Sequence, residues 1–393
     1  MNTKKLYYED SHLTTFTAAV TGCARVKKGW EITLDATAFY PEGGGQASDT
    51  GTLGEAAVFS VREEAAEIFH LCDQPLEVGS TVTGEIDWSR RFDLMQQHAG
   101  EHMVSGIIHK RYGWHNVGFH MGADMVTIDF DGPVPAEDLQ EIEDAANAAI
   151  WQDLPIKCWY PAPEELPKVP YRRKKDLPWP VRIVEVPGVD ICACCGTHPK
   201  TTGAIGLVKL FSCVKFHEGV RIEMGCGKRA LDILGHAFEQ NRQVSQAFSA
   251  KMQETGLAAR RMNEALSQEK FRAAALEKRL FAQIARNYAG KVVALHFESD
   301  LTPNSCRELC DAIADVAQIA VTLSGTDETG YCLCVVSRTE DAKAIGDRAV
   351  KALNGRGGGK KEAFQGRISA SGREIEAYFQ PQRIFCKKIL ETL

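Results

Sequence analysis

Two pairs of side chains that commonly bind metal ions lie about ninety residues apart in this sequence. His98 and His102 are separated by one helical turn, so on a helix their imidazoles would share one face. Cys194 and His198 have the same spacing, and the intervening Gly-Thr dipeptide favours a turn. One thiolate and three neutral imidazoles are suitable ligands for a tetrahedral Zn²⁺ site. These four residues together predict one zinc ion per chain, and zinc of this kind supports hydrolysis.

Several alternatives remain open at this stage. Cys192 and Cys195 compete with Cys194 as the thiolate ligand, and a purely structural zinc knot, which commonly uses more cysteines, is a further option. The stretch from His98 to His102 also reads His-x-x-Glu-His, the signature of inverted zinc peptidases, in which Glu101 would be the general base. Such a short pattern arises readily by chance. We therefore expect Glu101 to be a solvated helix residue.

Length and composition indicate a globular protein of several domains. The 393 residues are 44% hydrophobic and 25% charged, as in water-soluble proteins, and thirteen cysteines without disulfide-framework spacing fit a reducing cytosol. We find no apolar run near the ~20 residues of a membrane span and no secretory signal at the N-terminus. We expect a cytoplasmic protein with no membrane partner. The net charge of −6 argues against non-specific coating of nucleic acid, but not against a local basic surface.

Local patterns predict an α+β chain in four parts. Residues 1–88 alternate short β-like runs with turns and should form a small β-barrel. Residues 89–228 mix helical and strand periods and should form a two-layer α/β domain that carries both metal pairs. Residues 229–290 are helical, with two apolar stripes broken near Glu254, and predict a long helical hairpin or coiled-coil-like segment. Residues 291–393 predict a separate C-terminal α/β domain.

A glycine-rich stretch gives this chain a family resemblance. Phe39-Tyr-Pro-Glu-Gly-Gly-Gly-Gln46-Ala-Ser-Asp49 resembles the editing half of alanyl-tRNA synthetases and, more closely, the freestanding alanyl-tRNA editing proteins of AlaX type. The two metal pairs follow in the order of that family, and Gly219-Val-Arg221-Ile-Glu223 comes after them. Gly355–Gly359 and Phe364–Gly366 are similar to the DHH-associated domain that ends the synthetases. The resemblance covers essentially the whole chain.

This resemblance implies a hydrolase that deacylates tRNA(Ala) mischarged with serine or glycine. Because the sequence begins at the expected barrel and contains no P-loop motif, we expect an ATP-independent trans-editing enzyme and not a synthetase. The resemblance also implies a homodimer formed through the helical and C-terminal regions. Two other functions are retained as alternatives: a tRNA-binding module without turnover, and the His-x-x-Glu-His peptidase. Threonyl-type editing specificity is a near neighbour.

The resemblance further assigns roles to individual residues. As zinc ligands it favours His98, His102, Cys194 and His198, although Cys195 stands where related synthetases often have glycine. His120 is expected on the substrate side of the site, and Thr37 to hydrogen-bond the hydroxyl group that separates serine from alanine. The other expected pocket residues are Gln46, the glycines that permit close backbone approach, and a substrate-binding arginine: Gly43, Gly44, Gly45 and Arg221.

Three basic stretches are candidates for contacts with tRNA phosphates. The run Arg172–Lys175 lies beside Tyr171 and Trp179, although a short basic run is as often a solvated loop. A second group surrounds the second metal pair and a third surrounds the C-terminal glycines. The members of these two groups are Lys200, Lys209, Lys215, Arg221, Lys228, Arg356, Lys360, Lys361 and Arg367.

Overall fold

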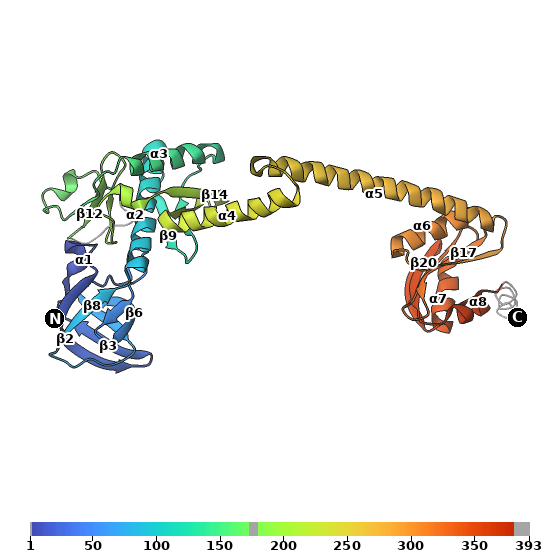
Figure 1. The fold of residues 1–393 in the computed structure, drawn as a ribbon, viewed down its shortest axis with the longest axis horizontal. Coiled ribbons are helices and arrows are strands. Elements are labelled where there is room, and N and C mark those ends of the chain that lie inside the picture. Colours follow the sequence, from blue (N-terminus) through green and yellow to red (C-terminus); the bar gives the residue numbers. More distant parts are fainter. Residues whose placement is uncertain (1, 173–179, 381–393) are drawn as a thin grey trace. The chain divides into compact units, whose positions relative to one another are not determined.

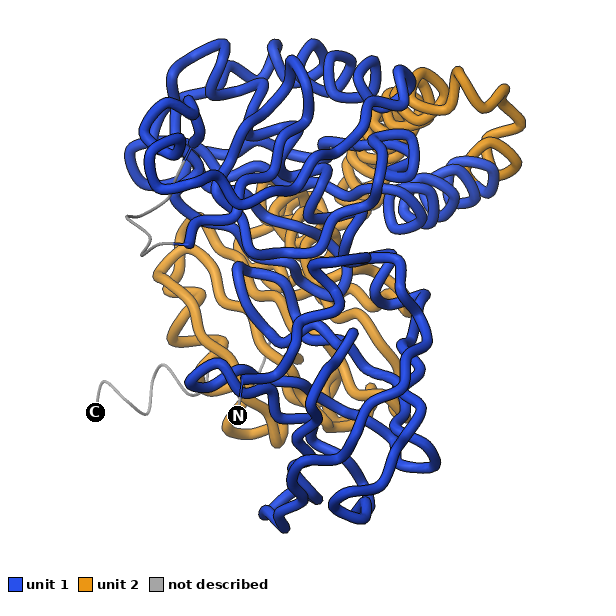
Figure 2. Tube along the Cα trace, turned by 90° about the vertical axis from the view of Figure 1, so that its left-hand side faces the viewer, with its two compact units in different colours: residues 1–243 blue, residues 244–393 orange. Residues whose placement is uncertain are grey.

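The computed structural model describes residues 2–172 and 180–380. The chain divides into two compact units, residues 1–243 and residues 244–393 (Figure 2). Several sheets and helices of both units confirm the predicted mixed α+β class (Figure 1). Of the predicted basic run, only Arg172 lies within the described residues, and Trp179 also lies outside them.

Six antiparallel strands near the N-terminus pair into a closed barrel (Figure 1). Along the strand from Glu67 to Cys72, every second residue is buried, as the two-residue period of a strand requires when one face covers a core. Closure leaves no unpaired strand edge in the ring. In the order of pairing, the strands are β2 (Thr15–Val26), β3 (Gly29–Leu34), β7 (Glu67–Cys72), β6 (Ala56–Glu64), β5 (Gly51–Leu53) and β8 (Thr81–Ile86).

The short elements β1 (Lys4–Lys5), α1 (Leu6–Glu9) and β4 (Ala36–Thr37) accompany the barrel. β1 and β4 form a parallel pair. β4 leads directly into the glycine-rich stretch, so that stretch leaves the barrel from a paired strand.

Helix α2 (Trp88–Tyr112) runs from the barrel to the sheets that follow it (Figure 1). The Asp87 side chain caps its first turn by accepting a hydrogen bond from the Arg90 amide at 3.2 Å. Gly113, in the left-handed conformation with φ 79°, ends it. The helix begins at the predicted border between the barrel and the two-layer domain of residues 89–228. Every residue from 94 to 106 is buried, so α2 is a central helix with no solvated face over this length.

A buried ion pair joins α2 to the segment after the glycine-rich stretch. The fully buried Arg91 guanidinium donates from Nε to Asp49 Oδ1 at 2.9 Å and from Nη1 to the Ser11 carbonyl at 2.9 Å. A buried charge is tolerated only when it is paired and hydrogen-bonded. This network therefore holds the glycine-rich stretch in place relative to α2.

Two further sheets of unit 1 surround α2. The four-stranded sheet pairs in the order β14-β15-β10-β9, and α3 (Leu139–Trp151) contacts both α2 and β14. Ile128, Ile222, Met103 and Ile142 belong to the shared core. The bounds are β9 (Asn116–Met121), β10 (Val126–Phe130), β14 (Val208–Phe216) and β15 (Gly219–Cys226), and for the three-stranded sheet β11 (Lys157–Trp159), β12 (Ile183–Val186) and β13 (Asp190–Ala193).

Two long helices occupy the predicted helical region: α4 (Gly227–Ala247) and α5 (Thr255–Ala285). The border between the two units lies within α4. The apolar stripe of each helix is largely exposed within the described residues; the hairpin pairing of the two helices stays a prediction. The exposed apolar side chains are Leu231, Leu234, Phe238, Val244, Leu257, Met262, Leu266, Phe271, Leu276 and Leu280. Among the described helices, none is both long and apolar enough to cross a membrane.

Unit 2 contains a five-stranded sheet with helices on both faces. Along β17, Ala320 packs with α6 and the end of α5, whereas Val321 packs with α7 and α8. The sheet pairs in the order β16-β17-β18-β20-β19. Its elements are β16 (Val293–Glu298), α6 (Pro303–Ala314), β17 (Ile319–Thr326), β18 (Gly330–Ser337), α7 (Ala342–Ala352), β19 (Gly355–Lys360), β20 (Ala363–Ile368) and α8 (Gly372–Phe379).

Candidate metal centre and substrate cavity

The four predicted metal ligands converge in the structure. Cys194 Sγ lies 3.3 Å from His98 Nε2 and 3.4 Å from His198 Nε2. One ligand atom from each of these three residues and from His102 lies within 4.8 Å of all the others. α2 presents the two histidines one turn apart, and the loop after β13 supplies the other pair. Cys195 is exposed and lies outside this cluster.

Outer hydrogen bonds orient two of the imidazoles. His98 Nδ1 lies 3.0 Å from Gln46 Oε1, and His102 Nδ1 lies 3.0 Å from Asp190 Oδ2. Because both oxygens accept, each Nδ1 carries the proton and each Nε2 is left to face the cluster. Gln46 also donates from Nε2 to Thr197 Oγ1 at 2.7 Å. Metal-binding histidines in proteins almost always have such a partner on the second ring nitrogen.

The chemistry of the donor set fits a zinc ion. Burial raises the pKa of the Cys194 thiol. Burial, together with the neighbouring His102 and His98, lowers the pKa of His198. Three imidazoles and one thiol that lie within contact distance of one another are a suitable ligand set for a divalent cation, which would displace the thiol proton when it binds. His98, His102, Cys194 and His198 would hold it.

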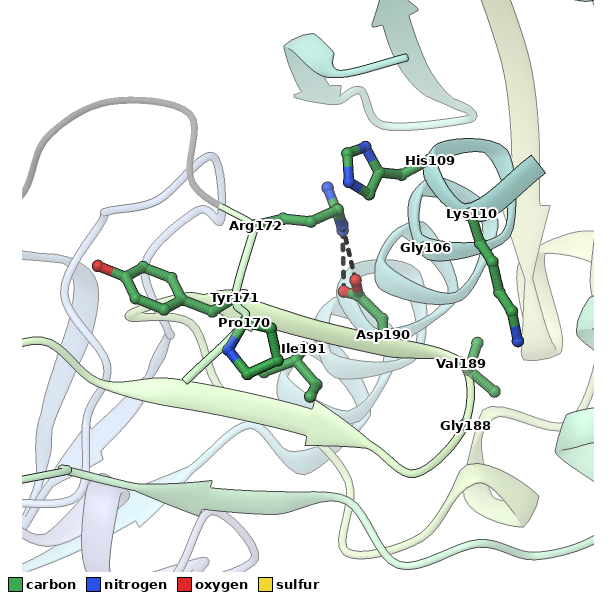
Figure 3. A pocket seen from close by; sticks show the side chains of 10 residues that line it. All are labelled: Gly106, His109, Lys110, Pro170, Tyr171, Arg172, Gly188, Val189, Asp190 and Ile191. Atoms are coloured by element: carbon green, nitrogen blue, oxygen red, sulfur yellow. Dashed lines mark hydrogen bonds and ion pairs between the residues drawn. The ribbon is translucent and has the colours of Figure 1, made fainter. Parts of the chain in front are cut away.

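An ion pair holds Asp190, the hydrogen-bond partner of His102. Arg172 donates from Nε to Asp190 Oδ1 at 2.6 Å and from Nη2 to Oδ2 at 2.8 Å (Figure 3). Burial alone would raise the pKa of Asp190, but the hydrogen bonds from His102 and Arg172 outweigh it and lower the pKa. Arg172, predicted to contact tRNA, is therefore engaged within the protein. His102, Asp190 and Cys192 form a second possible ligand group, which shares His102 with the first.

Gly106 allows α2 to lie close to Asp190. A Cβ atom at Gly106 would lie 2.6 Å from both Asp190 Cβ and the Val189 carbonyl oxygen, which is too close for any side chain. Arg172 and Asp190 also line a second cavity of about 450 Å³, and their ion pair is drawn in Figure 3. His109 and Lys110 of α2 contribute to the wall of this cavity.

A cavity of about 580 Å³ opens at the candidate metal ligands His98, His102 and Cys194. Gly44 and Gly45 line it with φ of 58° and 81°, in the left-handed region that favours glycine. A Cβ at Gly44 would lie 2.8 Å from Cys195 Sγ, and one at Gly45 would lie 2.6 Å from the Phe119 ring. Glycine is thus required where this stretch meets the opposite wall. Gly43 forms the preceding turn through paired backbone hydrogen bonds with Gln46 and does not line the cavity.

Glu101 corrects one sequence-based expectation. It is 3% exposed and lines the cavity, instead of being solvated. It accepts hydrogen bonds from Ser105 Oγ at 2.6 Å and from Asn116 Nδ2. A solvated position was expected because the short His-x-x-Glu-His pattern was attributed to chance; α2 is instead buried on all sides over this length.

Thr37, on β4 beside the barrel, is buried and does not line the cavity. Its Oγ1 accepts from the Phe39 amide at 3.1 Å and lies 2.9 Å from His70 Nε2. Burial lowers the pKa of His70 to about 4. The neutral ring donates from Nδ1 to the Ile32 carbonyl at 3.0 Å, so Nε2 accepts from the Thr37 hydroxyl. In this arrangement Thr37 positions the start of the glycine-rich stretch.

His120 and Arg221 also lie outside the cavity lining. Phe119 lies against His98, with ring centroids 5.3 Å apart, and the next residue of a strand points to the opposite face, so His120 is exposed. Arg221 pairs with Asp129 (Nε to Oδ1, 2.6 Å) and stacks on the Phe216 ring. The cluster, Gln46, Gly44 and Gly45 therefore come together, whereas Thr37, His120 and Arg221 do not join them.

Other residues of the site carry no sequence signal that we recognised. Arg182 donates from Nη1 to the carbonyls of Cys194 and Gly196 at 3.1 and 2.8 Å. Tyr8 donates to the Cys195 carbonyl at 2.9 Å, and the Arg182 guanidinium lies 4.8 Å from the Tyr8 ring centroid. They hold the ligand loop by its backbone, so no spacing rule identifies them.

Two family models match parts of the chain. The family model described as class II (A) tRNA synthetases matches residues 2–90, and that of the threonyl and alanyl tRNA synthetase second additional domain matches residues 181–223. The chain is 32% identical to the alanine–tRNA ligase of Thermofilum pendens over 388 residues, which are 93% of this chain and 42% of the ligase. It thus spans less than half of that enzyme.

Freestanding relatives match over nearly their full length. The chain is 27% identical to the alanyl-tRNA editing protein of Mus musculus over 400 residues, covering 95% of this chain and 96% of that protein. A solved structure, the C-Ala domain of Aquifex aeolicus alanyl-tRNA synthetase, matches 23% of this chain and 87% of its own at 20% identity, with a TM-score of 0.20. The chain belongs to the alanyl-tRNA editing proteins of AlaX type, relatives of the alanyl-tRNA synthetases.

Proposed function

We propose that this protein is a cytoplasmic, ATP-independent hydrolase that deacylates tRNA(Ala) carrying serine or glycine, using one zinc ion. The observation that carries the proposal is the convergence of His98, His102, Cys194 and His198 at a cavity of about 580 Å³. The relatives named as alanyl-tRNA editing proteins support the choice of tRNA.

The residues of this chain prepare the ester for attack by water. When bound, zinc supplies a Lewis acid that polarises a carbonyl or acidifies a water molecule. Gln46 and Asp190 fix the ring orientation of His98 and His102, so that both Nε2 atoms face the cluster. Gly44, Gly45 and the Phe119 ring form a close wall suited to a small side chain. No covalent nucleophile is required, because an aminoacyl ester is already activated.

Selectivity for serine requires hydrogen bonds to its hydroxyl group, because unpaired polar groups in a site reject the analogue that lacks the hydroxyl. The Thr37 hydroxyl is engaged with His70 and the Phe39 amide. We therefore propose an indirect role for Thr37, as a positioning residue of the glycine-rich stretch. His120 and Arg221 remain proposed substrate contacts at the margin of the site.

We propose that the body of the tRNA contacts basic side chains of unit 2. Arg356, Lys360, Lys361 and Arg367 are exposed on β19, β20 and the turn between them. We also propose a homodimer, supported by the exposed apolar side chains along α5.

Deacylation of three esters of one tRNA tests the function. Seryl-, glycyl- and alanyl-tRNA(Ala) are incubated with the protein before and after dialysis against a zinc chelator. Loss of the seryl ester is expected to be fastest, the alanyl ester should be spared, and the chelator should stop the reaction. Hydrolysis no faster than in buffer would refute the proposal. Matched variants at neighbouring cysteines, Cys194→Ala and Cys195→Ala, should differ, because only Cys194 joins the cluster.

Two other functions are tested by the same variants. Glu101 beside the cluster is what a His-x-x-Glu-His peptidase would need, and such an enzyme should lose peptide cleavage in Glu101→Gln but keep it in Cys194→Ala. The structure favours the deacylase, because Cys194 and His198 complete the cluster. A binding module without turnover would retain salt-sensitive tRNA binding and deacylate none of the three esters.

A further inference from the structure

Four cysteines of unit 2 gather between helix α6 and the sheet. Cys306 and Cys310 lie one helical turn apart on α6 and share one face of it. Cys332 and Cys334 lie two residues apart on β18 and share one face of the strand. α6 packs on β17 and β18 (Figure 1). Cys306 Sγ lies 3.4 Å from Thr322 Oγ1, and Thr322 is the β17 neighbour of Cys334, so the two cysteine-bearing faces meet.

The four thiols fall into two pairs. The Cys306 thiol is hydrogen-bonded with that of Cys332. The Cys310 thiol is hydrogen-bonded with that of Cys334, and it also lies 3.4 Å from the carbonyl oxygens of Ala320 and Cys334. Among the described residues, no three of these sulfur atoms lie close enough together to share one metal ion. The layer between α6 and the sheet therefore presents paired thiols and no metal-binding cluster within the described part of the chain.

The two pairs differ in their access to solvent and in their charge environment. Cys332 is half-buried and Cys306 is fully buried, whereas both members of the Cys310–Cys334 pair are fully buried. The hydrogen bond from Cys306 lowers the pKa of Cys332 to about 7, and Arg367, its neighbour across the strand pair on β20, acts in the same direction. The thiolate is the nucleophile in thiol chemistry. A small molecule therefore meets the first pair at Cys332, the member that carries the reactive form.

We propose that Cys332 and Cys306 form a thiol–disulfide exchange site that reacts with small disulfides such as oxidised glutathione. The site belongs to unit 2 and does not depend on the proposed deacylase function. Cys332 accepts the first attack product because it is accessible, and Cys306 resolves it because the two thiols are in contact. In reducing compartments such a bond is transient and redox-sensing, and it has no structural role.

The reaction takes two steps of thiol–disulfide exchange. In the first, the Cys332 thiolate attacks one sulfur of the small disulfide, forms a mixed disulfide with it and releases its other half as a thiolate. In the second, Cys306 gives its proton to a released thiolate and attacks the Cys332 sulfur. The Cys306–Cys332 disulfide forms, and the second half of the small disulfide leaves as a thiolate. Two protein thiols are oxidised, and the small disulfide is reduced to two thiols.

Peptide mapping of the wild type tests the proposal without any substitution. The full chain is incubated with oxidised glutathione, the remaining thiols are alkylated, and the peptides are mapped by mass spectrometry without reduction. A cross-link between Cys306 and Cys332 is expected, and reduced glutathione should remove it. The buried Cys310 and Cys334 should be recovered as thiols. Absence of the Cys306–Cys332 cross-link under conditions that modify the exposed Cys195 would overturn the proposal.

Two substitutions of Cys306 separate the attack from the closure of the disulfide. Cys306→Ser keeps a donor for Cys332 but cannot close the bond, so glutathione should remain on Cys332. Cys306→Ala lacks the donor as well, and Cys332 should be modified about fivefold to tenfold more slowly at pH 7, because its thiolate fraction falls towards that of an ordinary thiol. Cys310→Ser, a matched control on the same face of α6, should form the Cys306–Cys332 cross-link as the wild type does. Equal rates in the two Cys306 variants, or an unmodified Cys332 in Cys306→Ser, would overturn the proposal.

Discussion

Two groups of buried histidines in unit 1 have similar surroundings, but only one of the two groups forms a candidate metal site. His70 in the barrel and His98 and His102 on α2 are all buried, and each uses Nδ1 to donate to a protein oxygen. The difference lies at Nε2. Thr37 occupies that of His70, whereas those of His98 and His102 face a thiol and a third imidazole. Burial and a hydrogen bond do not make a histidine a candidate ligand; convergence of its second ring nitrogen with other donor atoms does.

Removing a ligand should have the largest effect. His102→Ala leaves three donors, and we expect zinc affinity to fall by about a hundredfold to a thousandfold, because a zinc ion held by four such ligands gains roughly 10–16 kcal/mol in all, or about 2.5–4 kcal/mol per ligand. Competition with a chromophoric chelator measures this. The comparison fails if His102→Ala retains the affinity of the wild type. His70→Gln is the control and should keep its zinc.

His70 should contribute to the pH dependence of stability. Its pKa is lowered from 6.5 to about 4 on folding, so between these values the unfolded chain binds more protons. Stability from this group is therefore complete above pH 6.5 and is lost as the pH falls towards 4, by about 3 kcal/mol. Urea unfolding of the wild type and of His70→Gln measures it. Equal slopes of stability against pH in the two proteins would contradict the assignment.

Weakening an outer hydrogen bond should have a smaller effect. Asp190→Asn keeps an oxygen that can accept from His102 but loses the charge that Arg172 neutralises. Zinc affinity should fall about tenfold to a hundredfold, as for other residues that support metal ligands. Chelator competition again provides the measurement. An affinity within twofold of the wild type would show that Asp190 does not orient the ligand.

His120→Ala should have the smallest effect. Because His120 is exposed, its proposed contact with the substrate lies at the margin of the site, and we expect kcat/KM for seryl-tRNA(Ala) to fall by only about threefold, the low end for one hydrogen bond. Zinc affinity should not change. A loss of a hundredfold in kcat/KM would contradict this marginal position.

The accuracy of the sequence-based predictions followed from the kind of signal available. The two metal pairs were found because their spacing is local: four residues bring two side chains to one side of a helix or across one turn. Glu101 was misjudged because its exposure depends on what surrounds α2, and Asp190 was missed because it approaches His102 across the gap left by Gly106. Neither property is written in the neighbouring residues.

The sequence by itself determined the mixed α+β class, the donor types of the candidate metal site and the family of the chain. Tertiary structure alone decided that Cys194 and not Cys195 lies within the histidine cluster. It also decided that the Thr37 hydroxyl is hydrogen-bonded to His70 and that Glu101 lines the cavity. The physical reason is that ligand types and short spacings are properties of the chain, whereas convergence, burial and hydrogen-bond partners depend on segments about fifty to two hundred residues apart packing against one another.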